Sequence, residues 1–215
     1  MDSVENLCKR YNLIPRTLLE VGASHPRNYR LDYFVKNGFN VILVEANPRL
    51  HFCLTKGSNN GDFRDVWPNV PPPPYQHSGL DGFKNCQILN IAISDRNETL
   101  KLFERDASTF ISGLNSPAKV NDHFQESESA PYYLVESKTI DKIDNGEIDV
   151  LLNDTEGCEY FSLTNLVSRP KIIVLETHGY SYTNPYIKEI SQWMKENNYS
   201  EIERDFADTL YVRNY

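Results

Sequence analysis

Apolar positions along the chain fall into short, nearly continuous runs, separated in several places by stretches where they recur every three or four residues. The continuous runs predict five buried strands: TLLEV (17–21), FNVILVE (39–45), QILNIAISD (87–95), IDVLLND (148–154) and KIIVLETH (171–178). The helical spacing occurs at 4–12, 28–38, 158–167 and 184–198. Strands without polar alternation are covered on both faces, so the pattern predicts an α/β fold with a mainly parallel sheet.

Other segments predict additional elements. TLKLFE (99–104) alternates and is expected to pair with 87–95 as a hairpin through residues 95–97. YYLVESKTI (132–140) predicts a separate strand, and YSEIERDFADTLYVR (199–213) predicts a hairpin that closes the sheet. The helix at 184–198 is expected to bury Ile187, Ile190, Trp193 and Met194 and to use Asn184 as its N-cap.

Two stretches lack both patterns. Residues 56–85 include four consecutive prolines at 71–74, which neither a helix interior nor a central strand accommodates. We expect a loop or insertion there, partly polyproline II. Residues 105–130 are polar and predict a loop on the substrate side of the fold. No internal repeat is visible, and the length suits one domain over residues 1–215.

Composition narrows the function classes. The formal net charge of −8 argues against a nucleic-acid partner, because the phosphate backbone would be repelled. No apolar run reaches the roughly eighteen residues of a membrane span, and the N-terminus does not resemble a secretory signal. The cysteines at 8, 53, 86 and 158 form no C-x-x-C pair. A zinc knuckle is therefore not predicted, and scattered thiols favour a reducing, cytoplasmic setting.

Acidic residues mark the ends of the first two predicted strands, where ligands bind in a parallel α/β sheet. The first end contains Glu20, Gly22, Ala23 and Ser24, and the second contains Glu45, Ala46 and Asn47. A dinucleotide site needs G-x-G-x-x-G at the first end, but this chain has a single glycine there. Glu45 nevertheless stands 23 residues after Gly22, close to the spacing of an acid that binds ribose hydroxyls.

A ribose-binding acid without a diphosphate cradle favours S-adenosylmethionine over a dinucleotide. That molecule has a ribose and an adenine, no phosphate, and a cationic sulfonium and ammonium that an acidic strand end attracts. Glu45 is then assigned to the ribose hydroxyls and Glu20 to the amino-acid end. The alternative is structural: Glu20 is a paired buried carboxylate, and Glu45 caps the next helix.

The fourth and fifth strand ends contribute candidate catalytic groups. Asp154, Glu156 and Glu159 cluster around a glycine, which indicates a catalytic or metal-adjacent acid, Asp154 first. The alternative is that these acids only complement the dipole of the following helix, with Glu159 structural. Glu176 and His178 are two residues apart and are expected to point toward the same space. His178 is therefore the candidate general base.

Six segments together resemble the FkbM family of S-adenosylmethionine-dependent methyltransferases. They are EVGAS, VEANPRL, NIAISD, TIDKI, IDVLLNDTEGCEYFSL and IIVLETH, in family order and approximate spacing, and D-x-E-G-x-E at 154–159 is the most specific. The resemblance covers roughly residues 17–178. It implies a Rossmann-like class I methyltransferase fold, with a seven-stranded, mainly parallel sheet whose last strand is antiparallel.

The resemblance also implies an activity and a set of site residues. Family members are mostly O-methyltransferases that act on hydroxyls of sugars, polyketides and similar metabolites. Gly22, Ala23 and Ser24 match the first glycine motif, and Glu45 matches the ribose acid. Ile91 and Ala92 in the NIAIS run are expected near the adenine, and Asp154 and Glu156 match the acidic motif. The family's usual D-V-G-A-N is replaced at Glu20 and at residues 24–26.

The expected activity is O-methylation of a small-molecule or glycan hydroxyl, with no membrane or nucleic-acid partner. The sequence predicts no particular oligomeric state. His178 is preferred as the base, with Asp154 and Glu156 as catalytic acids. A divalent metal held by Asp154 and Glu156 is the less favoured route, because the sequence lacks oxygen ligands at fixed spacing. Two alternatives stay open: a degenerate methyltransferase fold that only binds, and an NAD-dependent oxidoreductase.

Overall fold

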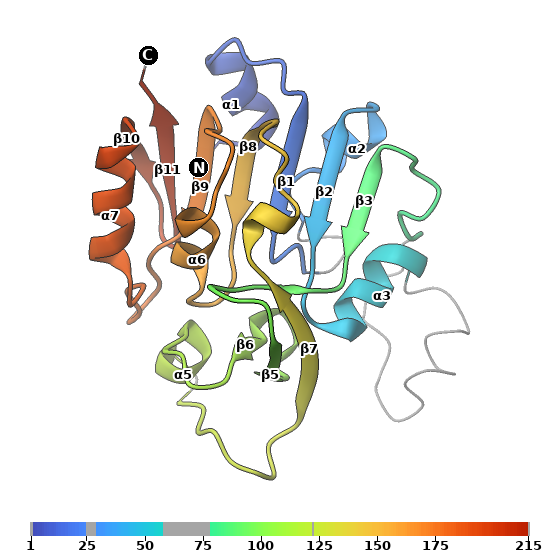
Figure 1. Ribbon diagram of the computed structural model, residues 1–215, viewed down its shortest axis with the longest axis vertical. Helices are drawn as coiled ribbons and strands as arrows, with labels where there is room; N and C mark the ends of the chain where they lie inside the picture. The colour runs from blue at the N-terminus through green and yellow to red at the C-terminus, as the bar shows by residue number, and fades with distance from the viewer. Residues whose placement is uncertain (1, 25–28, 58–77, 122, 215) are drawn as a thin grey trace.

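The computed structural model describes residues 2–24, 29–57, 78–121 and 123–214. Its centre is a seven-stranded sheet in the order β10-β11-β9-β8-β1-β2-β3 (Figure 1). The strands are β1 (Thr17–Val21), β2 (Asn40–Val44), β3 (Cys86–Leu89), β8 (Ile148–Asn153), β9 (Ile172–Glu176), β10 (Tyr199–Arg204) and β11 (Asp208–Arg213). Strands β3, β2, β1, β8 and β9 pair in parallel, and β11 runs antiparallel to β9 and β10. The predicted α/β fold is confirmed.

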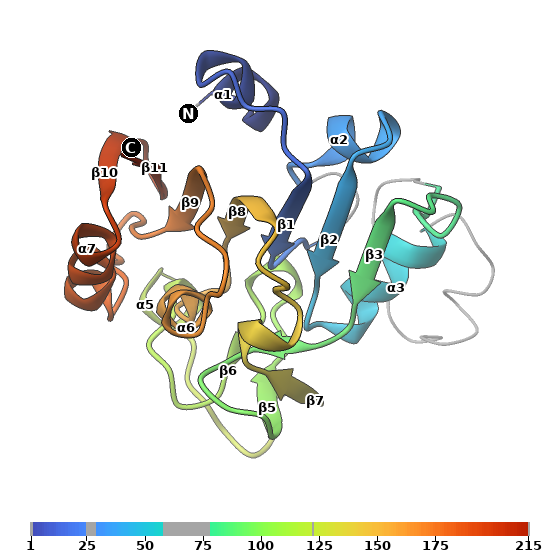
Figure 2. The same ribbon diagram turned by 45° about the horizontal axis from the view of Figure 1, so that its top comes forward.

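Helices cover both faces of this sheet (Figures 1 and 2). They are α1 (Val4–Arg10), α2 (Asp32–Lys36), α3 (Pro48–Lys56), α6 (Glu159–Thr164) and α7 (Ile187–Glu196). Leu18 belongs to one core cluster, with α1 and α2, whereas Leu19 belongs to the other, with α6 and α7. Neighbouring strand residues point to opposite faces, so each continuous apolar strand supplies both cores. This two-sided burial explains why the strands lack polar alternation.

A second, four-stranded sheet lies beyond the carboxyl ends of β1, β2 and β3 (Figure 1). Its order is β4 (Ala92–Ile93), β7 (Tyr132–Lys138), β5 (Thr99–Phe103) and β6 (Phe110–Ile111). The single strand predicted at 87–95 is therefore wrong: β3 and β4 belong to different sheets. The side chain of Asn90 donates to the backbone oxygens of Glu45 and Ala46, which holds the chain where it leaves the main sheet.

Two details of this smaller sheet also differ from the sequence prediction. The expected hairpin between 87–95 and 99–104 is wrong, because β7 lies between β4 and β5. Residues 105–130 are not only loop: they include a 3₁₀ turn (Asp106–Ser108), β6 and α5 (Pro117–Asn121). Phe103, Phe110 and Phe124 pack together with ring centroids 5.4 to 5.8 Å apart and anchor this segment. Widely spaced aromatics of this kind carry no periodic signal in sequence.

Helix α7 starts later than predicted. Asn184 is buried and forms a turn before the helix, since its carbonyl accepts from Ile187 N and its side chain accepts from Tyr186 N. Its amide also donates to Glu159, so this residue ties the turn to α6 instead of capping α7. As predicted, α7 buries Ile190 and Met194; Ile187 and Trp193 are half-buried.

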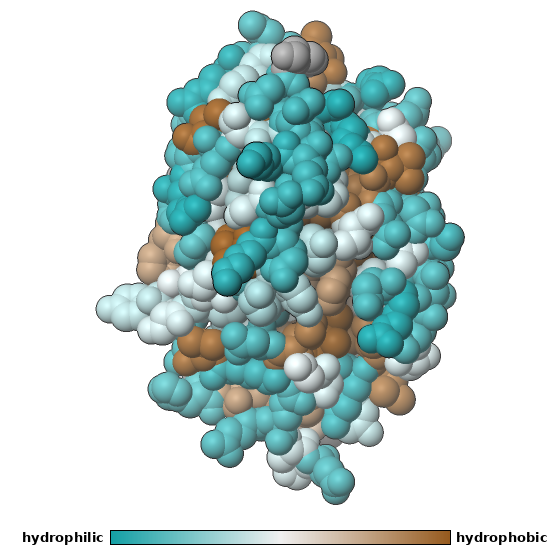
Figure 3. All heavy atoms as spheres, turned by 60° about the vertical axis from the view of Figure 1, so that its left-hand side comes forward, coloured by the Kyte–Doolittle hydropathy of each residue, from teal (hydrophilic) through white to brown (hydrophobic). Residues whose placement is uncertain are grey.

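The predicted polyproline segment at 71–74, most of the expected insertion (58–77) and His25 lie outside the described residues. No helix in the described part of the chain is long and apolar enough to cross a membrane. The face shown in Figure 3 is mostly hydrophilic, with apolar side chains in separate patches. This pattern is ordinary for a protein surface, where scattered apolar residues need no special explanation.

Candidate active site

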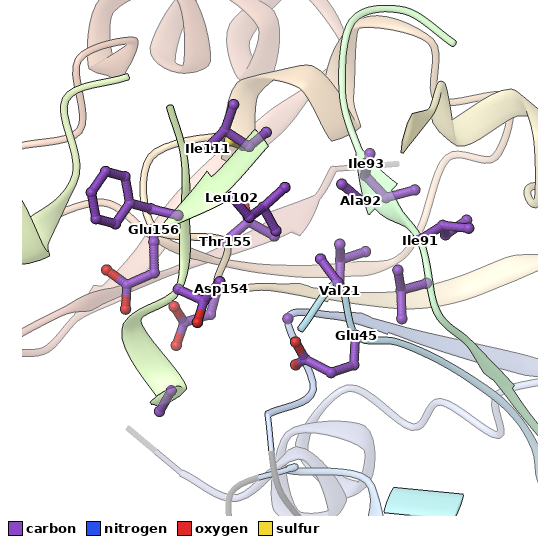
Figure 4. Close-up of a pocket in the computed structure, with 17 residues that line it drawn as sticks. Val21, Glu45, Ile91, Ala92, Ile93, Leu102, Ile111, Asp154, Thr155 and Glu156 are labelled. Atoms are coloured by element: carbon purple, nitrogen blue, oxygen red, sulfur yellow. The ribbon is translucent and has the colours of Figure 1, made fainter. Parts of the chain in front are cut away.

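Two adjoining cavities open at the carboxyl ends of the parallel strands, where the sequence predicted ligand binding. The apolar pocket has a volume of about 50 Å³ and is lined by Val21, Val44, Ala46, Ile91, Ala92, Ile93, Leu102, Phe110 and Ile111, among others (Figure 4). The acidic pocket, of about 380 Å³, is lined by Glu20, Gly22, Ser24, Arg30, Ala107, Asp154, Glu156 and Asp208. Gly22, Ala107, Asp154 and Glu156 line both pockets, so the two form one continuous cleft.

Gly22 permits the sharp turn at the end of β1. Its φ is +80°, and a Cβ at this position would lie 1.7 Å from the backbone oxygen of Asp154. The N–H groups of Gly22 and Ala23 both donate to Val44 O, which binds the turn to β2. Glycine is therefore required both for the backbone angle and for the close approach to β8. Ala23 is buried and does not line either pocket, whereas Ser24 lines the acidic pocket.

Glu45 follows β2 directly, and its carboxylate is paired to backbone N–H groups. Its Oε2 accepts from Ser24 N at 2.6 Å, and its Oε1 accepts from Asn47 N at 2.7 Å. Burial raises the pKa of Glu45 to about 7 despite these hydrogen bonds. The first contact orients the β1 turn and the second precedes α3, so Glu45 is held rigidly where it borders the apolar pocket (Figure 4).

Asn47 was predicted to contact the cofactor, but its described contacts are with the protein itself. Its side chain accepts from Arg49 N, which caps α3, and donates to Thr109 Oγ1 at 3.0 Å. Asn47 is fully buried and lies outside the lining of both pockets. It therefore fastens the 105–111 segment over the cleft. Ala46, by contrast, lines the apolar pocket.

Glu20 lies in a charged network that the sequence did not reveal. Both of its oxygens accept from Arg30 N at 2.9 Å, and Arg30 Nε lies 3.6 Å from Oε1. The guanidinium also donates to Asp208 at 2.6 Å. Burial is the main cause that raises the pKa of Glu20 to about 7. Among the lining residues of the acidic pocket, Arg30 is the only cation, facing four carboxylates.

The acids after β8 have two different roles. Asp154 and Glu156 line both pockets, and burial raises the pKa of Asp154. Glu159 is fully buried, and its Oε1 accepts from Thr155 N at 2.7 Å and from Gly157 N at 3.3 Å. Glu159 thus holds the backbone of the D-x-E-G-x-E loop in place. The structural alternative considered for Glu159 fits this geometry.

The structure separates Glu176 from His178, and the expectation that they share one space is wrong. Strand β9 ends at Glu176, and the N–H groups of Thr177 and His178 both donate to Ala207 O, so the strand alternation stops there. His178 Nδ1 pairs with Thr177 Oγ1 at 2.7 Å, and Nε2 lies 3.2 Å from an Arg204 nitrogen. Because arginine only donates, Nε2 must accept.

His178 is therefore a weak candidate for the base. Partial burial and the charge of Arg204 lower its pKa. Its described partners occupy both ring nitrogens, and it lines neither pocket. Glu176 instead faces the acids of β8: burial, then the charge of Asp154, raises its pKa well above the usual range, and it shares a hydrogen bond with Asp154.

The apolar pocket contains both residues predicted to lie near the adenine, Ile91 and Ala92. It also contains Thr109, Phe110 and Ile111, which sequence reasoning treated as loop. No spacing signal could have found them, because they reach the cleft through the pairing of β6 with β5. Arg30 was missed for the same reason: the chain places it beside Glu20 only after it folds.

Comparison with known proteins gives one extensive match. A family model described as "Methyltransferase FkbM domain" matches residues 20–201. No curated protein matches significantly. Among solved structures, similarity is found to monomeric WbdD (10% identity, 98% of this chain and 38% of that chain, TM-score 0.46). The chain is also similar to the methyltransferase domain of bacterial CtHen1-CN, with 10% identity over 98% of this chain and 95% of that chain and a TM-score of 0.44. A further similar structure is the glycopeptide N-methyltransferase MtfA with S-adenosyl-L-methionine, with 9% identity over 99% of this chain and 87% of that chain and a TM-score of 0.40.

Proposed function

Given that the chain belongs to the FkbM methyltransferase family, we propose that it transfers a methyl group from S-adenosylmethionine to a hydroxyl of a sugar or another small metabolite. The observation that carries the proposal is the acidic cleft at the carboxyl ends of β1, β2 and β8. The seven-stranded sheet, with β11 antiparallel, supports the class I methyltransferase fold as part of the same proposal.

The residues of the cleft fit a cationic adenosyl ligand. Four carboxylates against one guanidinium line the acidic pocket, a balance that attracts a sulfonium or ammonium group and repels a diphosphate. The adjoining apolar pocket suits a planar base, which apolar side chains flank without needing charge. The same reasoning argues against an NAD-dependent oxidoreductase.

Each part of the ligand has a candidate partner. We assign the ribose hydroxyls to Glu45, since each of its oxygens keeps a second lone pair after accepting one N–H. We assign the adenine to Ala46, Ile91 and Ala92. At the amino-acid end, Glu20 pairs with Arg30, and we assign the ligand's carboxylate to that guanidinium. Ser24 lines the same pocket.

S-adenosylmethionine supplies an electrophilic methyl group on a positively charged sulfur. In the proposed transfer the sulfur–methyl bond breaks and an oxygen–methyl bond forms, which leaves a neutral thioether and one proton from the hydroxyl. The protein must align the acceptor and remove that proton. Asp154 and Glu156, which line both pockets, are the groups placed to receive it.

The surroundings of the site agree with a small acceptor. Ala107, Thr109, Phe110 and Ile111 border the cleft, which supports a substrate-side role for this segment. Four carboxylates against one guanidinium in the lining disfavour a nucleic-acid acceptor. All four cysteines are free thiols, which supports the proposed cytoplasmic setting.

The test combines binding and turnover. Calorimetry with S-adenosylhomocysteine and with NAD should show saturable binding of the first and none of the second. Isotope-labelled methyl transfer should then be screened over hydroxylated acceptors, with amines as a second panel. Transfer only to amines would refute the hydroxyl assignment. Binding without transfer to either panel would favour a module that binds the ligand without turnover.

A further inference from the structure

Three carboxylates converge where β8 and β9 end, and one of them, Asp154, lines the acidic pocket. Asp154 follows β8, Glu176 ends β9 and Glu159 begins α6. Each offers one oxygen, and the three oxygens lie within 4.8 Å of one another. Carboxylates this close disfavour one another's ionisation unless a positive charge offsets them. The charge of Arg30 acts to lower the pKa of Asp154, but this guanidinium also pairs with Glu20 and Asp208, so one cation is shared among several acids.

We propose that Asp154, Glu159 and Glu176 hold a hard divalent cation, of the class of Mg²⁺, Mn²⁺ or Ca²⁺, beside the acceptor. Such ions take oxygen ligands, at about 2.0–2.1 Å for Mg²⁺ and about 2.3–2.6 Å for Ca²⁺. Two oxygens bound to one Ca²⁺ are therefore at most about 5 Å apart, and the three oxygens, all within 4.8 Å of one another, fall inside that limit. The smaller ions require the carboxylates to move slightly inward.

A buried hydroxyl gives an independent sign that something binds at this cluster. Tyr182 is only 2% exposed, and its hydroxyl has no hydrogen-bond partner among the described residues. That hydroxyl lies 3.4 Å from the point where a Cβ on Gly157 would stand, next to the loop that Glu159 braces. Burial raises the pKa of Tyr182, and the charges of Glu159 and Glu176 raise it further, which is consistent with a hydroxyl close to the cluster.

Unpaired buried polar atoms are rare because each one costs free energy. Besides the Tyr182 hydroxyl, Glu176 Oε2 is buried without a hydrogen-bond partner in the described part of the chain. A cation would take Glu176 Oε2 as a ligand, and a water on that cation would accept from Tyr182. A single bound ion thus resolves the carboxylate repulsion and both unpaired atoms.

The remaining oxygens of the cluster leave room for coordination. Glu159 uses Oε1 for the loop and accepts from Asn184 through Oε2, which still has a second lone pair. The role of the cation rests on the proposed function: a hydroxyl bound to the cation would lose its proton more readily, and with Asp154 on the cation, Glu156 would receive that proton. The existence of the site does not depend on that role.

The test uses the full chain, freed of metal by chelation and titrated with MnCl₂. Electron paramagnetic resonance reports the free Mn²⁺, and Mg²⁺ and Ca²⁺ are added as competitors. We expect one saturable site in the wild type, with at least tenfold weaker affinity in Glu176→Gln and in Asp154→Asn. Glu189→Gln is the matched control, an exposed acid on α7 that should bind Mn²⁺ as the wild type does.

Thermal melts establish that each variant is folded before it is titrated. No saturable binding in the wild type would overturn the proposal and leave a proton shared by Asp154 and Glu176 as the occupant. Equal affinity in Glu176→Gln, Asp154→Asn and Glu189→Gln would also overturn it. Separate measurements of S-adenosylhomocysteine binding and of methyl transfer distinguish the two proposals. If the protein binds Mn²⁺ but transfers no methyl group, the cation site is supported and the proposed activity is not.

Discussion

Buried carboxylates near the end of β2 and near the ends of β8 and β9 have different surroundings. After β2, Glu45 has each oxygen paired to a backbone N–H. At β8 and β9, Asp154, Glu159 and Glu176 face one another across less than 5 Å. A rigid, paired carboxylate suits recognition of neutral hydroxyls. A crowded set of carboxylates suits a cation, so under the proposed function the first region binds the ligand and the second serves proton removal.

The largest expected effect comes from the residue that joins the two regions. Gly22→Ala places a Cβ 1.7 Å from Asp154 O at a φ of +80°, so it should destabilise the fold by at least about 3 kcal/mol in urea denaturation. Gly38→Ala is the control, with the same φ and no atom within 4 Å, and it should cost only about 1 kcal/mol. Equal losses would show that the approach to β8 is unimportant.

Asp154→Asn should impair methyl transfer through the region at the ends of β8 and β9. The substitution keeps the size of the side chain and removes one of the charges that crowd the β8 and β9 ends. We expect kcat for methyl transfer to fall by at least about a hundredfold, a typical contribution for a positioned acid or base. The dissociation constant for S-adenosylhomocysteine should change by less than threefold. A loss of binding with unchanged kcat would reverse the assignments of the two regions.

Glu45→Ala should weaken ligand binding in the region that follows β2. Removing the carboxylate eliminates both ribose contacts, so we expect at least tenfold weaker binding of S-adenosylhomocysteine, equivalent to about 1.4 kcal/mol. Calorimetry provides the measurement, and a thermal melt checks that the turns at Ser24 and Asn47 survive. Glu136→Ala, an exposed acid on β7, is the control. Unchanged affinity in Glu45→Ala would remove this residue from the site.

The pH dependence of binding should sharpen the role of Glu45. Its pKa is raised to about 7 in the folded protein, so its ionised form costs stability above pH 7, and that cost is relieved as the pH falls toward 4.5. The ribose hydroxyls need the ionised form, so affinity for S-adenosylhomocysteine should weaken several-fold from pH 8 to pH 6. Glu45→Gln should flatten this profile. An equally steep profile in that variant would assign the titration to another group, such as Glu20.

The smallest expected effect is at His178. Because Thr177 and Arg204 pair with its ring and it lines neither pocket, His178→Asn should change kcat by less than about threefold. Initial rates at saturating S-adenosylmethionine test this directly. A hundredfold loss, with ligand affinity intact, would restore His178 as the general base and would require the β9–β11 side to move during turnover.

The local part of the structure could be predicted from sequence. Four of the five apolar runs correspond to β1, β2, β8 and β9, and the run at 87–95 contains most of β3 and all of β4. Continuous burial leaves a direct mark on residue choice. The acidic residues at the strand ends were found for a similar reason: chain order places them at one edge of a parallel sheet. Glu45, Asp154 and Glu156 all border the cleft, as expected from that edge.

Tertiary structure alone decided which of these groups meet. Arg30 reaches Glu20 and Asp208, residues ten and 178 positions away, and that contact has no counterpart in local spacing. The pairing of β6 with β5 brings Phe110 to the cleft, and the arrangement beyond β9 turns Glu176 toward Asp154 and His178 toward Arg204. Sequence patterns determine which face of an element is buried, whereas partners across the fold depend on packing between elements distant in the chain.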